Sequence, residues 1–450
     1  MLTRAVEWIK REISARRGLV PQPEKRAMVH EVLDPASLHR WVEEMHDSVR
    51  GDHQLSEARY QQIYAELERA DASPVSGASS EDGTQAYLPR DVNVSLVQSV
   101  FTECLVSRLE DLVKPLPPGH TSFAEFVQRE VDPFKRFGPC DPGWAETLIA
   151  KGISVFEGGD WKFPDGRAPD VRLEPNARVV VVGDWGTGLK GAQDVGIQMG
   201  RKVADARRER RQVHVLHLGD VYYSGWKEEY ERRFIPFWPV QQPTDGVSSW
   251  ALNGNHDMYS GGRGYFGFLL RDKLFAAQNG SSYFRIGNDE WQLLGLDSAY
   301  KDFDLAGGQA AWVGSKLGES KRTMLLSHHE PFTSFIDDFA EPKMVARLRE
   351  AIGSRTIDAW LWGHEHLCCV YDDDLHPYLH FGSCIGHGGV PVLPLGAKRP
   401  HLQWQFDGSE LHADVAWQSF GFAVLDFDGG DLEITYWDQS GSPTGPTVQL

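Results

Sequence analysis

Five short motifs place metal-ligand side chains directly after short apolar segments. They are Gly183-Asp184-Trp185-Gly186, Gly219-Asp220-Val221-Tyr222-Tyr223, Gly254-Asn255-His256-Asp257, His328-His329-Glu330-Pro331 and Gly363-His364-Glu365-His366. Carboxylates, imidazoles, an amide and a phenol are oxygen and nitrogen ligands that suit iron, manganese or zinc. Glycine beside most of these ligands lets the backbone turn sharply toward a shared centre. The ordered set therefore predicts a site that holds metal ions.

The elements that position these motifs begin near residue 177, where short apolar strands alternate with helical segments. Strands are expected at 178–182, 213–218, 250–253, 293–296, 324–327, 359–362 and 378–381. A helix is expected at 191–210, with its basic end as a solvated C-terminus, and a hairpin at 422–437 with its turn at 428–431. Ligands in open α/β sheets bind beyond the carboxyl ends of the strands, so the five loops are expected to converge on one cleft.

The first two motifs carry two features, Gly186 and Tyr223, that together indicate a particular family. With GDxG at 183–186 and GDxxY at 219–223, the chain resembles the calcineurin-like metallophosphoesterase superfamily, and within it the purple acid phosphatase branch. The superfamily begins with GDxH, and that branch lacks the His but gains a Tyr. The resemblance covers about residues 177–437. It implies an α/β fold, a β-sandwich flanked by helices (αββα).

The resemblance also implies two metal ions and a ligand for each position. Asp184, Tyr223 and His366 would hold the first ion, Asp220 would bridge, and Asn255, His364 and one His of the 328–329 pair would hold the second. The phenolate-containing set suits Fe(III), and the imidazole-rich set suits Fe(II), Zn(II) or Mn(II). Strand alternation is expected to point Tyr222 to the opposite side from Tyr223.

The fourth motif leaves two registers open. Counting from the strand side gives LxxH and favours His328, whereas counting back from Pro331 gives His-x-Pro and favours His329. We take His328 as the metal ligand. His329 would then contact the phosphate or satisfy a loop.

Three further residues are candidates for substrate chemistry. By resemblance, His256 lies near the leaving-group oxygen as a proton donor or charge stabiliser, and Asp257 would orient it. A structural role for His256 is the alternative. His387 lies on a glycine loop, 386–389, and is a candidate for substrate contact.

The resemblance implies a metal-dependent phosphoric ester hydrolase that cleaves phosphate monoesters by attack of a metal-bound hydroxide, with His256 assisting the leaving group. A phosphodiesterase or nucleotide pyrophosphatase using the same site is the alternative. A binding protein without turnover would be expected to lose ligands, and the one missing His is compensated.

Composition bounds the remaining possibilities. The chain has 450 residues, 46 Lys+Arg against 64 Asp+Glu, and a net charge of −18, which argues against nucleic acid as the main partner. A small phosphorylated substrate fits, because bound metals would supply the local positive charge. Five cysteines, no signal-like N-terminus and no apolar run of membrane length predict a cytoplasmic protein without a membrane span. The oligomeric state stays open.

The N-terminal part of the chain carries no catalytic signature. Helical spacing occurs at 37–46, 56–70, 92–114 and 122–131, with a Ser/Gly/Pro-rich connector at 72–85 and a loop-rich stretch at 158–175. We therefore predict a mostly helical region at 1–170, and a catalytic domain at 171–450. The first region would cap the cleft, mediate dimerisation or bind a partner.

Overall fold

The computed structural model describes residues 160–450 apart from 166–167, 318–320, 336–340, 374, 393, 395–397 and 413–414. The four predicted N-terminal helices and the 72–85 connector lie outside the described residues, so they remain predictions. Of the region before 171, residues 160–165 and 168–170 are described. There the Tyr300 hydroxyl donates to the Trp161 carbonyl at 2.8 Å, and the Phe163 and Tyr300 rings lie 5.0 Å apart.

One sheet is built from the strands that carry the first three motifs and from the C-terminal hairpin. Its strands β2, β3 and β4 are parallel, and β14, β15 and β16 are antiparallel. The order is β16 (Pro443–Gln449), β15 (Asp431–Asp438), β14 (Gly421–Asp428), β2 (Arg178–Val182), β3 (Val213–His217) and β4 (Val247–Ala251).

The second sheet carries the last two motifs. Strands β6, β7, β8 and β10 run parallel in its centre, so the loops after β7 and β8 leave the same edge. The order is β1 (Asp170–Arg172), β5 (Phe284–Gly287), β6 (Trp291–Gly295), β7 (Arg322–Ser327), β8 (Ile357–Trp362), β10 (Leu379–Ile385), β9 (Cys368–Tyr371) and β11 (Leu402–Gln405). A separate two-stranded sheet pairs β12 (Ser409–His412) with β13 (Val415–Gln418).

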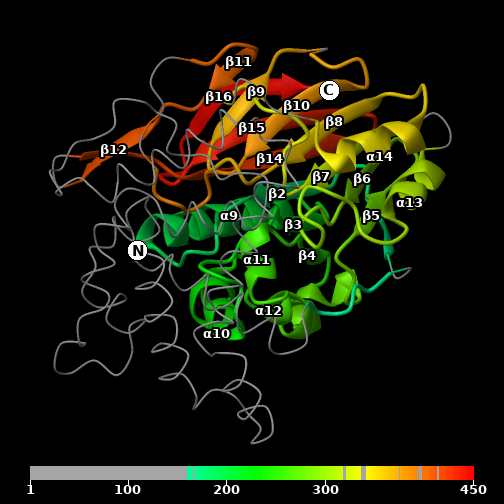
Figure 1. Cartoon of the computed structure of the whole chain (residues 1–450). Coiled ribbons are helices and arrows are strands. Elements are labelled where there is room, and N and C mark those ends of the chain that lie inside the picture. The colour runs from blue at the N-terminus through cyan, green and yellow to red at the C-terminus, as the bar shows by residue number, and fades with distance from the viewer. Residues whose placement is uncertain are drawn as a thin grey trace, which may run out of the picture. The chain divides into compact units, whose positions relative to one another are not determined.

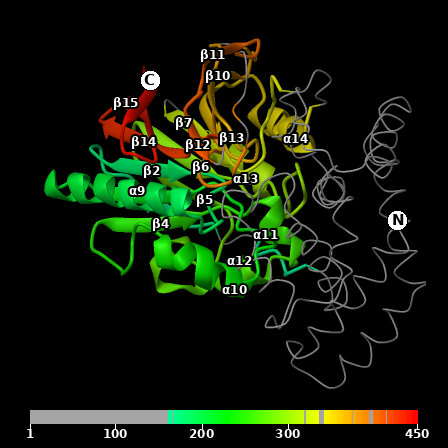
Figure 2. The same cartoon turned by 90° about the vertical axis from the view of Figure 1, so that its left-hand side faces the viewer.

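Helices cover the outer faces of the two large sheets. The long helix α9 (Lys190–Arg208) lies along the sheet that contains β2 and β4 (Figure 2). Its buried residues pack in one cluster with the outer side chains of β2 and β3. Helices α13 (Gln309–Lys316) and α14 (Lys343–Ile352) cover the other sheet. The shorter helical turns, all between β3 and β5 (Figure 1), are α10 (Lys227–Glu229), η4 (Tyr230–Phe234), η5 (Ile235–Phe237), α11 (Asn255–Tyr259), α12 (Arg263–Gly267), η6 (Leu269–Arg271) and η7 (Lys273–Gln278).

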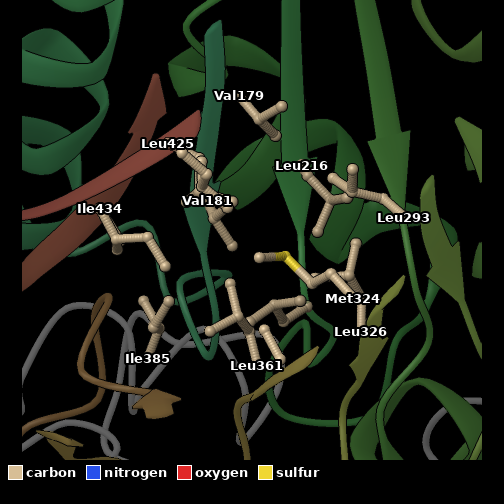
Figure 3. Packing of buried hydrophobic residues seen from close by; sticks show 14 of the residues in the cluster. Val179, Val181, Leu216, Leu293, Met324, Leu326, Leu361, Ile385, Leu425 and Ile434 are labelled. Carbon is tan, nitrogen blue, oxygen red and sulfur yellow. The ribbon is translucent and has the colours of Figure 1, made fainter. Parts of the chain in front are cut away.

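The inner faces of the sheets meet in a core of aliphatic and aromatic side chains. Val179 and Val181 of β2 face Met324 of β7 and Leu361 of β8 in one buried cluster (Figure 3). The alternate residues Val180 and Val182 pack instead under α9. Strands such as β2 and β7 are buried on both faces, which explains why their sequences are largely apolar. The predicted αββα fold is confirmed.

The predicted elements recur with shifted ends. Strand β4 begins and ends earlier than the 250–253 prediction, and the hairpin turn closes with Asp428 opposite Asp431 as expected. β1 lies inside the stretch predicted as loop. Among the described residues, no helix is both long and apolar enough to cross a membrane.

Candidate metal centre

The ligand motifs leave their strands through backbone turns that L-residues rarely adopt. Asp184, Asp220, His364 and His366 have φ values of 55°, 76°, 67° and 52°. Each such residue costs on the order of 1–3 kcal/mol and persists where the surrounding structure holds it. The described part of the chain has eight non-glycine residues with positive φ, and these four predicted metal ligands are half of them. Unfavourable backbone conformations are thus concentrated at the predicted site.

A first cluster brings together two carboxylates, one imidazole and one phenol. The Tyr222 hydroxyl oxygen lies 3.1 Å from Asp184 Oδ1, 3.1 Å from Asp220 Oδ2 and 3.0 Å from His366 Nε2. Asp184 Oδ1 and His366 Nε2 are 3.6 Å apart. All four side chains are buried.

A second cluster joins the Asn255 amide to imidazoles from the other sheet. His328 Nε2 lies 3.0 Å from Asn255 Oδ1, 3.1 Å from His364 Nδ1 and 3.5 Å from Asp220 Oδ2. His328 Nδ1 donates to the Leu218 carbonyl at 3.0 Å, which turns Nε2 toward the cluster. Such an outer hydrogen bond fixes the tautomer of a metal-binding histidine.

Asp220 Oδ2 belongs to both clusters, and the spacings fit metal coordination. Ligand atoms about 2.0–2.2 Å from one ion are separated from each other by about 3.0–3.5 Å, depending on the geometry. The contacts around Tyr222 and His328 fall between 3.0 and 3.5 Å. The residues present therefore fit two metal ions that share one carboxylate.

The pKa shifts of the buried carboxylates and imidazoles also fit bound metal ions. Burial, together with the neighbouring Asp257, raises the pKa of Asp184 well above its ordinary value. Burial and the nearby Asp184 and Asp257 carboxylates raise the pKa of Asp220. Burial lowers the pKa of His366 to about 3 and that of His328 well below its usual range. Bound cations would stabilise the ionised carboxylates and the neutral imidazoles at once.

The structure departs from the sequence prediction at the tyrosine. The phenol in the first cluster is that of Tyr222, whereas the Tyr223 ring lies against the guanidinium of Arg233 at 5.2 Å. The alternation argument assumed that a strand continues past Asp220, but the chain turns there, and Val221 makes only an isolated bridge with Gly186. The Tyr222 N–H donates to the Gly186 carbonyl at 3.2 Å, so Tyr222 stands beside the position that lacks the family histidine.

Two glycines are required by close packing inside the site. A Cβ at Gly254 would lie 2.0 Å from Asp220 Oδ1. A Cβ at Gly186 would lie 2.7 Å from the Asp220 carbonyl oxygen. Any side chain at either position would displace the shared carboxylate or its backbone.

His256 and Asp257 are both at the site, but they are held differently from the prediction. The His256 N–H donates to Asp220 Oδ1 at 3.0 Å, and its Nδ1 donates to the Tyr223 carbonyl at 2.7 Å. Asp257 instead accepts the N–H groups of Asp220 and Gly254, at 2.9 and 2.7 Å. A backbone carbonyl therefore orients the His256 ring, and Asp257 ties the loops of the second and third motifs together.

His329 lies beside the second cluster. Its ring nitrogens are 3.1 Å from Ser298 Oγ and 3.2 Å from Asp302 Oδ1. Its ring packs against that of Phe303 at an angle of 45°, with centroids 4.0 Å apart. A nitrogen of His329 lies within 4.8 Å of ligand atoms of His328 and His364, so the structure keeps His329 close to the centre without the Asn255 contact that His328 makes. Sequence spacing gave no sign of the Ser298–Asp302 loop.

His387 packs away from the ligand contacts. Its ring lies 5.2 Å from that of Phe406, and its Nε2 would lie 2.4 Å from a Cβ at Gly421. Neither ring nitrogen has a hydrogen-bond partner, and burial lowers the pKa to about 3. The ring therefore faces Phe406 and Gly421 in this structure, and the substrate contact of His387 stays a prediction.

Other histidines and the cysteines belong to the core or the surface. His217 packs edge-on against Phe234 at 5.0 Å, and burial lowers its pKa to about 3. His380 on β10 is exposed. Cys368, Cys369 and Cys384 are buried free thiols.

Comparisons with known proteins show what this chain is similar to. Residues 177–368 match the family model of calcineurin-like phosphoesterases. Tartrate-resistant acid phosphatase type 5 of Homo sapiens is 24% identical over 336 residues, covering 66% of this chain and 95% of the relative. The Rattus norvegicus protein of the same name is 23% identical over 299 residues, covering 59% and 87%.

Among solved structures, one described as GAP50, the anchor in the inner membrane complex of Plasmodium, covers 62% of this chain and 89% of its own, with 11% identity and a TM-score of 0.42. The family match spans the first three motifs, the His328 loop and the Gly363–His366 motif. The chain therefore carries a calcineurin-like phosphoesterase domain over residues 177–368.

Proposed function

We propose that this protein is a binuclear metallophosphatase that hydrolyses phosphate monoesters. The domain is that of a hydrolase acting on phosphate esters, and its relatives are acid phosphatases. The observation that carries the finer proposal is Asp220 Oδ2, which lies 3.1 Å from the Tyr222 hydroxyl and 3.5 Å from His328 Nε2. One carboxylate oxygen is thereby available to both ligand sets.

The ligand sets assign a role to each side chain. Asp184, Tyr222 and His366 would hold one ion, and Asn255, His328 and His364 the other. Metal ions so held would lower the pKa of a coordinated water and neutralise charge on the phosphate. The hard first set supports Fe(III) there, and the imidazoles support Fe(II), Zn(II) or Mn(II) in the second.

His256 is the side chain that would serve the leaving group. Because Nδ1 donates to the Tyr223 carbonyl, Nε2 is the atom that would hold a proton for the leaving-group oxygen. Burial lowers the His256 pKa to about 3, and a phosphate anion nearby would favour the protonated ring. His329, oriented by Ser298 and Asp302 beside the second cluster, would contact the substrate phosphate.

Asp220→Asn tests the proposal. The variant removes the shared negative charge, so metal content measured by plasma mass spectrometry and phosphate release should fall together. Asp426→Asn is the matched control, because Asp426 is a partly buried carboxylate of β14 paired with Arg178 outside the site. If Asp220→Asn kept two tightly bound metals and normal turnover, the shared-carboxylate assignment would be wrong.

The substrate class is decided by assaying the wild-type protein on phosphate monoesters, diesters and nucleotides in parallel. We expect the highest kcat/KM on a monoester. A higher value on a diester or a nucleotide anhydride would instead support the phosphodiesterase or pyrophosphatase alternative. The odd number of cysteines supports a further proposal of a cytoplasmic location, which fractionation of the source cells would test.

A further inference from the structure

A buried ion pair follows the loop that carries Asp220 and Tyr222. Glu229 ends α10, and Arg233 lies one turn later in η4. The Arg233 Nη1 and Glu229 Oε1 atoms are 3.1 Å apart, and the side chains are 10% and 9% exposed. A buried pair is favourable only when additional hydrogen bonds offset the loss of hydration. The groups that hydrogen-bond to Glu229 and Arg233 therefore indicate the structural role of the pair.

Glu229 and Arg233 both bind the backbone of residues 222–226. The Glu229 carboxylate accepts three N–H groups, from Tyr223 through Oε1 and from Ser224 and Trp226 through Oε2, the last two at 3.0 and 2.9 Å. Arg233 Nη1 donates to the Tyr222 carbonyl. Both charges of the pair thus act on the short loop that begins with the metal-site phenol.

The same segment also contacts the loops of the first and third ligand motifs. The Tyr230 hydroxyl, between the two charged residues, donates to Asp257 Oδ1. The Phe234 ring packs edge-on against Trp185, the residue after Asp184, at 5.3 Å. The ion pair therefore lies where the loops of the first three motifs are joined by side-chain contacts.

We propose that Glu229 and Arg233 are positioning residues for Tyr222. The pair fixes the carbonyl of Tyr222 and the following N–H groups, and this holds the phenol oxygen against Asp184, Asp220 and His366. The inference rests on the proposed function, because it assigns Tyr222 to the first metal. It predicts that loss of the pair weakens the first site and spares the second, whose His328 is oriented by Leu218.

The test is calorimetric titration of metal-free protein with Mn²⁺, followed by Zn²⁺. Outer residues that orient metal ligands typically contribute 10–100-fold to affinity. We expect Arg233→Met and Glu229→Gln each to weaken one of two binding events by that factor. Lys227→Met and Glu231→Gln are matched controls, because that i,i+4 pair lies in the same segment at 3.3 Å with side chains 57% and 44% exposed. These controls should bind both ions as the wild type does.

Two further variants separate positioning from general structural damage. In a Tyr222→Phe background, Arg233→Met should produce no additional loss at the first site, because the residue it positions no longer supplies an oxygen. The double exchange Glu229→Arg with Arg233→Glu restores the charges but not the acceptors for three N–H groups, so it should not rescue binding. Arg233→Lys, which keeps the charge with simpler donor geometry, should lose less affinity than Arg233→Met.

Several results would overturn the inference while leaving the proposed function intact. They are equal losses at both sites, no loss at either, additivity with Tyr222→Phe, or full rescue by the charge exchange. If Arg233→Met does not give a cooperative thermal transition, Arg233→Lys is titrated in its place, and wild-type affinity at both sites would then overturn the inference. A wild-type protein that binds neither Mn²⁺ nor Zn²⁺ would instead refute the proposed function itself.

Discussion

Tyr222→Phe removes one oxygen and leaves the rest of the first cluster in place. That oxygen lies 3.0 to 3.1 Å from three other ligand atoms, and the ring itself is packed against His256 with centroids 4.6 Å apart. Phenylalanine retains this packing, so the fold should survive. Orienting residues contribute 10–100-fold to metal affinity, so loss of a ligand should cost at least about 100-fold, or about 2.7 kcal/mol.

The assay compares Tyr222→Phe with Tyr223→Phe, which differ only in register. Wild-type protein loaded aerobically with iron should show a visible tyrosinate-to-Fe(III) charge-transfer band. Tyr222→Phe should lose both the band and one equivalent of metal after dialysis, and Tyr223→Phe should keep both. The reasoning is refuted if Tyr223→Phe bleaches the protein and Tyr222→Phe does not. A colourless wild-type protein that contains only manganese or zinc would refute the proposal of Fe(III) at the first site.

Three other variants probe separate parts of the account. His256→Ala should keep both metals and lower kcat about 10²–10⁴-fold, with a smaller deficit on nitrophenyl esters, whose leaving groups need little protonation. Gly254→Ala should lower metal content, because its Cβ meets the shared carboxylate at 2.0 Å, whereas Gly430→Ala has no atom nearer than 3.6 Å and should bind metal normally. Burial lowers the pKa of His217 to about 3 in the folded protein. Below about pH 6.5, His217 is therefore protonated in the unfolded chain but not in the folded one. Stability therefore falls as pH drops, and His217→Phe should reduce the loss in unfolding free energy between pH 7 and pH 5 by about 2 kcal/mol, with the exposed His380→Phe as the control.

Much of the site could be predicted because ligands follow strands. Apolar runs fix β2, β3, β7 and β8, parallel strands end at one edge of a sheet, and a ligand placed just after such a run has few places to lie. Asp184, Asp220, Asn255, His364 and His366 are therefore brought together as predicted. That prediction rested on the residue types and on their positions directly after the strands.

Local rules failed where the backbone left regular geometry. Asp220 has a φ of 76°, so the chain turns after β3 and Tyr222 rather than Tyr223 faces the carboxylates. The period of two that holds within a strand says nothing about a residue beyond such a turn. The acceptor role of Glu229 depends on three backbone N–H groups brought near by folding, so no sequence pattern announces it.

Some strands were not predicted because their sequences lack the apolar runs that mark a strand. β16 contains proline and glycine, yet it pairs with β15 at the outside of its sheet, where a missing N–H is tolerated. β9 has only four residues, Cys368–Tyr371, and begins two residues after His366, so no separate strand-length apolar run marks it in the sequence.

Anomalous diffraction from crystals of the metal-loaded protein tests the shared-carboxylate centre most directly. Data collected at the absorption edge of the loaded metal locate each ion without assuming any ligand. The account predicts two peaks on either side of the Asp220 carboxylate, at roughly the 3.5–4 Å spacing of two-metal sites, with Tyr222 at one and His328 at the other. A single peak, or two peaks that do not share Asp220, would contradict it.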